Sequence, residues 1–274
     1  MPRANKNKEA AVGSQNRTVS PNEAKSALTH CIQLQRPIMM WGAPGIGKSD
    51  IVKQIADAEG REVIDIRLPL WEPTDIKGIP YYNSKENNMV WASPAELPTD
   101  PKSNAIVFLD ELNSAAPAVQ AAAYQLILNR RVGQYHLPEG VSIVAAGNRD
   151  SDKGVTYRMP APLANRFVHV ELRVDFEDWM EWATTNHIHA DVVGYCTFAK
   201  QDLYDFDPKG SSRSFATPRS WSFVSQLLSD DLPESTLTDL VAGCVGEGLA
   251  VKFMNHRKIS GQLPNPSDIL SGKV

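Results

Sequence analysis

Apolar runs of strand length alternate with helical patterns through the first two thirds of the chain. The runs lie at residues 37–41, 62–68, 105–109 and 141–146. Short, nearly continuous apolar runs are typical of strands that are buried on both faces of a parallel sheet. Helical patterns lie between them, for example at 48–59 and 117–131. The alternation predicts an α/β fold in which helices flank a parallel sheet.

A helix start precedes the first of these strands. Ser20 can cap the helix, Pro21 suits its first turn, and Glu23 stands three residues after the cap. We expect this helix to run to about Gln35.

Two stretches interrupt the alternation with hairpin patterns. One holds two apolar segments, 79–83 and 89–91, on either side of a polar turn, and the other is the shorter stretch 131–140. The aromatic residues near the first hairpin could grip a substrate or pack against their own domain, and the sequence leaves both open. They are Trp71, Tyr81, Tyr82 and Trp91.

After Val170 the pattern changes to helices. Asp175 can cap a helix whose apolar residues recur at the spacing of one buried face, namely Phe176, Trp179, Met180 and Ala183. Further helical patterns cover 188–200, 218–229 and 234–256, with a polar loop at 201–216. We therefore expect a disordered tail at 1–17, an α/β domain at 18–172 and a smaller helical domain at 173–274.

The composition is that of a globular protein without a global signature of nucleic-acid binding. Of 274 residues 42% are hydrophobic, and 28 Lys+Arg against 32 Asp+Glu give a net charge of -4. The basic tail leaves contact with nucleic acid open. Three scattered cysteines fit a reducing compartment, and no run approaches the ~18 apolar residues that a membrane helix needs. We expect a cytoplasmic protein that does not enter a membrane.

A glycine-rich segment between the first strand and the next helix matches the pattern G-x-x-x-x-G-K-[ST] in full. The segment is Gly42-Ala43-Pro44-Gly45-Ile46-Gly47-Lys48-Ser49, followed by Asp50. Its glycines let backbone N–H groups converge on phosphate oxygens, and the helix N-terminus adds partial positive charge. Lys48 is expected to reach the β- and γ-phosphates, and Ser49 to ligate Mg²⁺. Residues 42–50 are the predicted nucleotide-binding segment.

Polar residues follow two further strands. Asp110 and Glu111 end the strand at 105–109, where an open α/β sheet binds its ligands. We expect Asp110 to hold Mg²⁺ and Glu111 to activate or orient the attacking water. Asn148 follows the strand at 141–147, which should lie between the other two strands, and its amide could position the water or bind the γ-phosphate.

Together these motifs resemble those of the AAA+ ATPases, and within them the MoxR-type group. The acidic strand end that runs into a helix at 110–120 is similar to that group's motif, and Ala145-Ala146-Gly147-Asn148 is similar to its sensor 1. The hairpins at 79–91 and 131–140 lie where this branch has its helix-2 insert and its pre-sensor hairpin. The resemblance implies an AAA+ P-loop NTPase core followed by an α-helical lid domain.

The resemblance also gives roles to two arginines. Arg166, in Leu163-Ala164-Asn165-Arg166-Phe167, matches the arginine finger that reaches a neighbouring subunit's ATP site, with Arg149 and Arg158 as nearby rivals. Arg219, in Thr217-Pro218-Arg219, matches sensor 2. Asn165 stands where an acidic residue is frequent in the family, which puts the local pairing of the finger in doubt.

The function implied is that of a Mg²⁺-dependent ATPase that forms a homo-oligomeric, hexameric ring and remodels or activates a partner protein. The resemblance also suggests a partner with a von Willebrand factor A domain. Two alternatives stay open. One is a DNA-directed AAA+ motor or loader, and the other is a scaffold that binds ATP to assemble but turns over negligibly.

Overall fold

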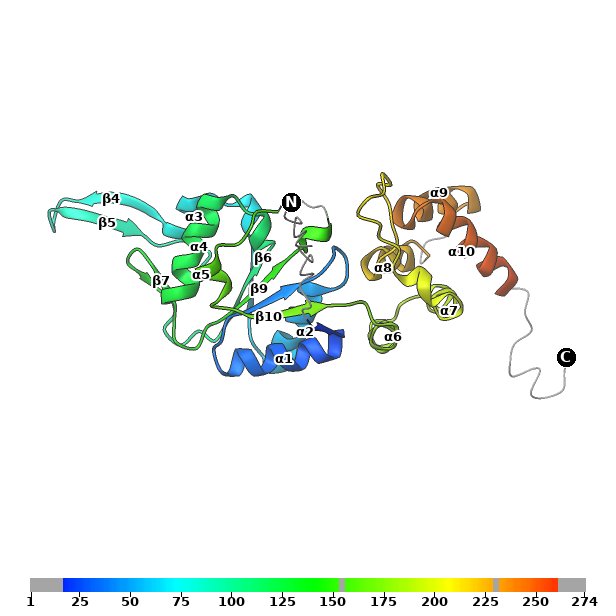
Figure 1. The fold of residues 1–274 in the computed structure, drawn as a ribbon, viewed down its shortest axis with the longest axis horizontal. Helices are drawn as coiled ribbons and strands as arrows, with labels where there is room; N and C mark the ends of the chain where they lie inside the picture. Colours follow the sequence, from blue (N-terminus) through cyan, green and yellow to red (C-terminus); the bar gives the residue numbers. More distant parts are fainter. Residues whose placement is uncertain (1–16, 153–155, 229–231, 261–274) are drawn as a thin grey trace, which may run out of the picture.

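The computed structural model describes residues 17–152, 156–228 and 232–260. The predicted disordered tail lies outside the described residues except for Arg17, and so does the predicted helical domain beyond Ser260. In Figure 1 an α/β unit and a helical unit lie next to each other along the long axis of the molecule.

Six parallel strands form the central sheet, in the order β1-β10-β2-β9-β6-β3. The four strands predicted from apolar runs are confirmed: β2 (Ile38–Trp41), β3 (Val63–Arg67), β6 (Ile106–Asp110) and β9 (Ser142–Gly147). The expected place of β9, between β2 and β6, is confirmed as well. Because these strands are parallel, their carboxyl ends reach the same edge of the sheet.

Two further strands extend the sheet beyond the sequence prediction, β1 (Thr18–Val19) and β10 (Val168–Leu172). Since β10 continues to Leu172, the prediction that only helices follow Val170 is wrong. Apolar and polar residues alternate along β10, as is typical of a partly exposed strand. The outer neighbour of β10 is the two-residue β1, which leaves much of β10 exposed.

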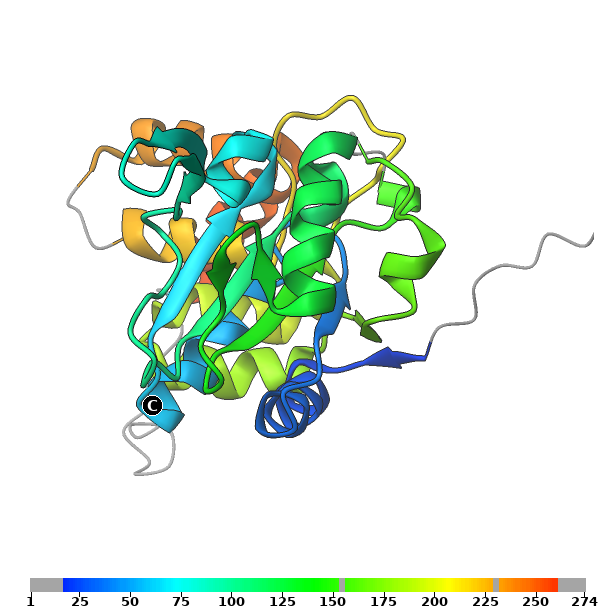
Figure 2. The same cartoon turned by 90° about the vertical axis from the view of Figure 1, so that its left-hand side faces the viewer.

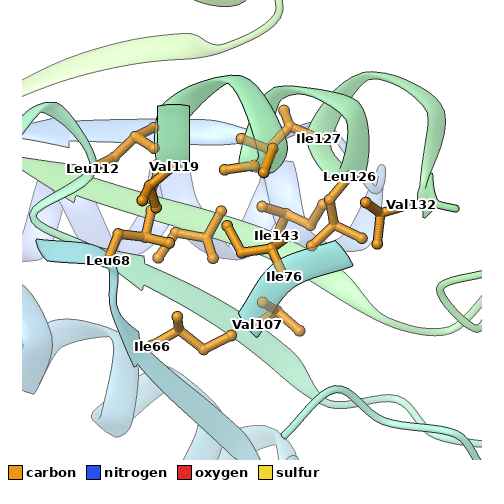
Figure 3. Packing of buried hydrophobic residues seen from close by; sticks show 14 of the residues in the cluster. Ile66, Leu68, Ile76, Val107, Leu112, Val119, Leu126, Ile127, Val132 and Ile143 are labelled. Carbon is orange, nitrogen blue, oxygen red and sulfur yellow. The ribbon is translucent and has the colours of Figure 1, made fainter. Parts of the chain in front are cut away.

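Helices cover both faces of the sheet, as Figures 1 and 2 show. In β9, Val144 and Ala146 join the apolar cluster under α1 and α2, whereas Ile143 and Ala145 join the cluster under α4 (Figure 3). Burial of both faces explains why the strand sequences are nearly continuous in apolar residues. The helices of these layers are α1 (Pro21–Gln33), α2 (Lys48–Glu59), α3 (Pro73–Lys77) and α4 (Pro117–Asn129).

The capping box predicted for α1 is present, and it also joins the two units. Ser20 N–H donates to Glu23 Oε2 at 2.8 Å, and Ser20 Oγ accepts from Glu23 N–H at 3.4 Å. The Ser20 hydroxyl donates in turn to Asp178 Oδ2 of the helical unit at 2.6 Å. The N-terminus of α1 is thereby tied to the first helix of that unit.

Both predicted hairpins are confirmed. They are β4 (Ile79–Asn83) with β5 (Asn88–Ala92), and β7 (Arg131–Val132) with β8 (Tyr135–His136). The aromatic residues differ in burial, and a role in gripping a substrate stays a prediction. Trp71 packs on the main core, and Trp91 N–H donates to Gln134 Oε1 in the turn of the second hairpin at 3.3 Å. Tyr81 and Tyr82 are exposed on the hairpin that projects from the α/β unit in Figure 1.

The helical unit has its own apolar core. Asp175 caps its first helix as predicted, because its Oδ1 accepts from Asp178 N–H at 3.2 Å, and Trp179 and Ala183 of that helix are buried. The helices are α6 (Phe176–Thr185), α7 (Ala190–Phe198), α8 (Pro218–Leu227), α9 (Glu234–Val245) and α10 (Glu247–Ser260). None of the described helices is long and apolar enough to span a membrane.

Short helical segments complete the described elements. They are α5 (Ala161–Ala164) and the 3₁₀ turns η1 (Leu68–Leu70), η2 (Leu112–Ser114), η3 (Asp150–Asp152) and η4 (Lys200–Leu203). The turn η4 occupies the start of the stretch 201–216 that was predicted as a loop.

The single helix predicted at 234–256 is wrong, because Gly246 separates α9 from α10. Its backbone has φ 95° and ψ 151°, a conformation that only glycine adopts readily. Apolar periodicity continues on both sides of Gly246, so periodicity alone does not reveal the break.

This break gives a test with a matched control. Gly246→Ala should lower the free energy of unfolding by about 1–3 kcal/mol, because an L side chain is strained in that conformation. Gly243→Ala should raise it by about 0.5–1 kcal/mol, since Gly243 lies inside α9 and an added Cβ meets nothing within 4 Å. Urea denaturation followed by circular dichroism measures both. Equal effects of the two substitutions would contradict the break at Gly246.

Candidate nucleotide-binding site

The loop between β2 and α2 has a backbone shape that depends on its glycines. Gly45 and Gly47 have φ of 74° and 93°, in the region that side-chain-bearing residues rarely adopt. At Gly42 an added Cβ would lie 2.5 Å from Ile46 Cδ1. The loop leads directly into the N-terminus of α2 at Lys48, so backbone N–H groups and the positive end of the helix face the same place.

Lys48 is buried, and its ammonium group has three acceptors. Its Nζ donates to the carbonyl oxygens of Gly42 at 2.6 Å and Ala43 at 2.9 Å, and to Asn148 Oδ1 at 3.2 Å. Burial lowers the pKa of Lys48 to about 8, and Arg219 acts in the same direction. The carboxylates of Asp110, Asp152 and Glu111 oppose this shift. A bound phosphate chain would add the negative charge that favours the protonated form.

Asp110 and Glu111 lie at the carboxyl end of β6, beside the phosphate loop. Ser49 Oγ donates to Asp110 Oδ2 at 3.4 Å, and Glu111 N–H donates to Asp110 Oδ1 at 2.9 Å. Glu111 has a left-handed backbone with φ 54°, where the chain turns away from the strand into η2. Its side chain is exposed at the edge of the site.

These oxygen donors fit Mg²⁺. The ion prefers hard oxygen ligands and usually keeps several waters while it binds one or two protein groups and substrate phosphates. Ser49 and Asp110 would supply a hydroxyl and a carboxylate. In the described part of the chain no three His, Cys, Asp or Glu side chains converge on a possible metal position, so phosphate and water would complete the shell.

The helical unit reaches the same place through α8. Arg219 N–H donates to the carbonyl oxygen of Gly45 at 3.2 Å, and a Cβ on Gly45 would lie 2.6 Å from Thr217 Oγ1. The N-terminus of α8 thus packs directly on the phosphate loop. The exposed side chain of Arg219 lines the cavity at this junction, and its role as sensor 2 stays a prediction.

This cavity has a volume of about 790 Å³, within the usual range for small-molecule sites. Polar residues of the phosphate loop line one part. Apolar and aromatic side chains line another part, among them Trp179, Trp182 and Ile188 of the helical unit. Such a cavity fits a nucleotide, because the cationic part can bind the anionic phosphates and the apolar part can bind the base.

The structure brings together the predicted residues of the phosphate loop, the acidic strand end, Asn148 and Arg219. Several residues in or beside the site were missed. Arg67 ends β3 and is the register partner of Asp110, so its place after a buried strand could have indicated it. Trp179 was assigned only to a buried helix face. Asn113 contacts Asn148, and no pattern in the sequence around Asn113 indicates this contact.

Arg166 is not among the residues that line this cavity. It is exposed in the turn between α5 and β10. Of its two rivals, Arg149 is held by ion pairs to Asp152 at 3.1 Å and to Glu171 at 3.3 Å, which also raise its pKa. Arg158 is exposed like Arg166.

A hydrogen-bonded pair links the start of the phosphate loop to the segment before Arg166. Trp41 Nε1–H donates to His169 Nδ1 at 2.9 Å, and the other ring nitrogen of His169 lies 2.7 Å from the carbonyl oxygen of Ala164. The Trp41 and His169 rings are stacked with centroids 6.0 Å apart. The turn that carries Arg166 is therefore connected to β2, which leads into the phosphate loop.

Comparison with known proteins finds similar sequences. Residues 37–167 match the family model of the AAA domain of the dynein-related subfamily. Midasin from Giardia intestinalis is 28% identical over 186 residues, and Midasin from Dictyostelium discoideum is 26% identical over 167. The matches cover 64% and 55% of this chain but 4% and 3% of these much longer relatives.

Solved structures with a similar arrangement are more distant in sequence. RuvB of Thermotoga maritima, a Holliday junction branch migration motor, has a TM-score of 0.47 at 16% identity, with 86% of this chain and 67% of that chain covered. NtrX of Brucella abortus in complex with ADP has a TM-score of 0.47 at 14% identity, with 78% and 50% covered. The family model, which matches residues 37–167, and the strand order instead support an AAA+ P-loop NTPase fold for this chain.

Proposed function

We propose that the chain binds ATP with Mg²⁺ in this cavity and hydrolyses its γ-phosphate. The observation that carries the proposal is the convergence of three segments on one point. Lys48 of the phosphate loop contacts Asn148, and Ser49, the next residue, contacts Asp110. Phosphoryl transfer needs a cation that binds the phosphates, a carboxylate that binds the metal and a polar group that orients the water, and all three lie at one edge of the sheet.

Each residue has a separate task in this proposal. Lys48 neutralises the β- and γ-phosphates, and the N-terminus of α2 holds them through its backbone N–H groups. Mg²⁺, held by Ser49 and Asp110, would neutralise charge on the phosphate oxygens. Glu111 accepts the proton of the attacking water, and Asn148 orients that water or the γ-phosphate. Arg219 contacts the phosphates from the helical unit and couples its position to the nucleotide.

Arg166 is proposed to act on a neighbouring subunit. Its side chain is exposed in the turn between α5 and β10, and its resemblance to the arginine finger suggests that a second copy presents its nucleotide to Arg166. Such contacts repeat head to tail, and they form a ring when the rotation between subunits closes. We therefore propose a homo-oligomeric ring, a hexamer as in the MoxR-type group, that uses hydrolysis to remodel a partner protein.

The exposed hairpin residues Tyr81 and Tyr82 are available for such a partner. Turnover that rises with added DNA and falls with salt would instead favour the DNA-directed motor. ATP-dependent assembly with negligible turnover would favour the scaffold.

The lowered pKa of Lys48 predicts how ATP affinity depends on pH. The phosphates favour the protonated ammonium, so ATP binding should take up a proton above pH 8, and affinity should fall as the pH rises through about 8. Calorimetry at about pH 9 in two buffers of different ionisation enthalpy measures this uptake. In Lys48→Arg the guanidinium stays charged, and the uptake should vanish. Equal uptake in both proteins would contradict the role of Lys48.

Glu111→Gln separates binding from hydrolysis. The amide keeps the shape of the side chain but cannot accept a proton, so hydrolysis should fall on the order of 10²- to 10⁴-fold while ATP still binds. Phosphate release and calorimetry measure the two steps. Glu96→Gln makes the same chemical change at an exposed position outside the site and should leave both unchanged. Near wild-type hydrolysis by Glu111→Gln would show that another group is the base.

Mixing of inactive variants tests whether Arg166 acts in trans. Arg166→Ala should bind ATP but turn over on the order of 10³- to 10⁵-fold more slowly, and Lys48→Ala should not bind it. In mixed assemblies some interfaces join an intact phosphate loop to an intact Arg166, so partial activity should return.

Arg158→Ala is the control, and it should stay active by itself. If verified mixed assemblies recover no activity, linked dimers of defined order show whether one repaired interface is enough. No recovery there either would count against action in trans.

A further inference from the structure

Asn113 is a fully buried polar residue in the turn that follows the acidic pair. It lies in η2, two residues after Glu111, and is 1% exposed. Its side-chain Nδ2 donates to the carbonyl oxygen of Asn148 at 2.8 Å, and its Oδ1 accepts from Asn148 N–H at 3.2 Å. One side-chain amide therefore binds both backbone polar groups of a single residue.

The sheet register shows what these two bonds replace. The register of β9 with β6 ends at Ala145, opposite Leu109, and its register with β2 ends at Gly147, opposite Trp41. β6 ends at Asp110 and the chain turns away at Glu111, and neither β6 nor β2 has a residue in register with Asn148. The Asn113 amide takes the place of a strand neighbour and extends the ordered part of β9 by one residue.

The surroundings leave Asn113 little freedom. A Cβ on Gly147 would lie 2.4 Å from Asn113 Oδ1 and 2.6 Å from Met39 Cε, so the side chain packs closely against a position that only glycine fits. The backbone of Asn113 is held as well, because Tyr157 N–H donates to its carbonyl oxygen at 2.7 Å. The amide is thus fixed on both sides.

We propose that Asn113 is a positioning residue that sets where the Asn148 side chain stands relative to Lys48 and Glu111. This inference rests on the proposed hydrolysis of ATP, in which Asn148 orients the water or the γ-phosphate. Asn148 Oδ1 lies 3.2 Å from Lys48 Nζ, so a shift of its backbone would break that contact. Because Asn113 and Glu111 belong to the same turn, the amide fixes the distance between the base and Asn148.

The chemistry of the contact requires an asparagine. It needs one donor and one acceptor side by side, which only an amide supplies at this length. Asn113→Asp keeps the acceptor for Asn148 N–H but places a second acceptor against the Asn148 carbonyl oxygen. Asn113→Leu has the same branching at Cγ with a larger side chain, and it supplies neither bond. Asn129→Asp, at the exposed end of α4, is the matched control for the change of charge.

Amide hydrogen exchange tests the contact without any need for turnover. The Asn148 amide should exchange at least tenfold faster in Asn113→Leu than in wild type, and its rate should be unchanged in Asn129→Asp. An unchanged Asn148 rate in Asn113→Leu would overturn the proposal. If the wild type does not hydrolyse ATP but the Asn148 amide still exchanges faster in Asn113→Leu, the contact is supported and the proposed ATP hydrolysis is overturned.

Kinetics test the positioning role. Asn113→Asp should lower kcat on the order of 10- to 100-fold with little change in KM, because the phosphate loop is untouched while Asn148 is misplaced. In an Asn148→Ala background the same substitution should cause no further loss of kcat, since no side chain remains to be positioned. Asn113→Asp should lower Tm by the same amount in the wild-type and the Asn148→Ala backgrounds, because Asn148→Ala keeps the backbone groups of residue 148 that the Asn113 side chain binds.

A loss of kcat in Asn113→Asp that multiplies with that of Asn148→Ala would show that Asn113 does not act through Asn148. A normal kcat in Asn113→Asp with a lowered Tm would show that its role is structural. Either result overturns the proposal.

Discussion

Three parallel strands, β2, β9 and β6, lie side by side in the sheet, and each continues into a residue of the site at its carboxyl end. Lys48 follows β2 through the glycine loop, Asn148 follows β9, and Asp110 ends β6. The sheet therefore brings together residues 61 and 100 positions apart in sequence, which then contact each other. The apolar side chains that bury both faces of the sheet hold this arrangement, because a slip in register would expose them.

Two residues of the site are in energetically unfavourable states, the buried ammonium of Lys48 and the left-handed backbone of Glu111. A buried ammonium is unfavourable unless it is hydrogen-bonded, and Lys48 uses all three of its N–H donors on two loop carbonyls and the Asn148 amide. Its lowered pKa shows that these neutral acceptors do not replace water fully. Glu111 has a left-handed backbone at the strand end. Both features have a physical reason if a phosphate chain supplies the missing charge and Glu111 must face it.

Local patterns predicted what depends on neighbouring residues in the chain. Four of the six strands of the central sheet, the caps at Ser20 and Asp175, both hairpins and the phosphate loop follow from periodicity and turn chemistry. The strand β10 was missed because its apolar and polar residues alternate, whereas the predicted strands were recognised by continuous apolar runs. The break at Gly246 was missed because periodicity does not reveal a backbone φ. Asn113 could not be found, since its role depends on where β6 ends relative to β9. The part played by Arg166 depends on a second subunit and stays a prediction.

The central claim is that one strand edge gathers Lys48, Asp110 and Asn148 around the terminal phosphate of ATP. A crystal structure of the protein with Mg²⁺ and a non-hydrolysable ATP analogue tests this claim most directly. The γ-phosphate should lie within hydrogen-bond distance of Lys48 Nζ and the Asn148 amide, with the metal bound to Ser49 and linked to Asp110. A nucleotide bound elsewhere, or a triphosphate that does not contact Lys48, would contradict it.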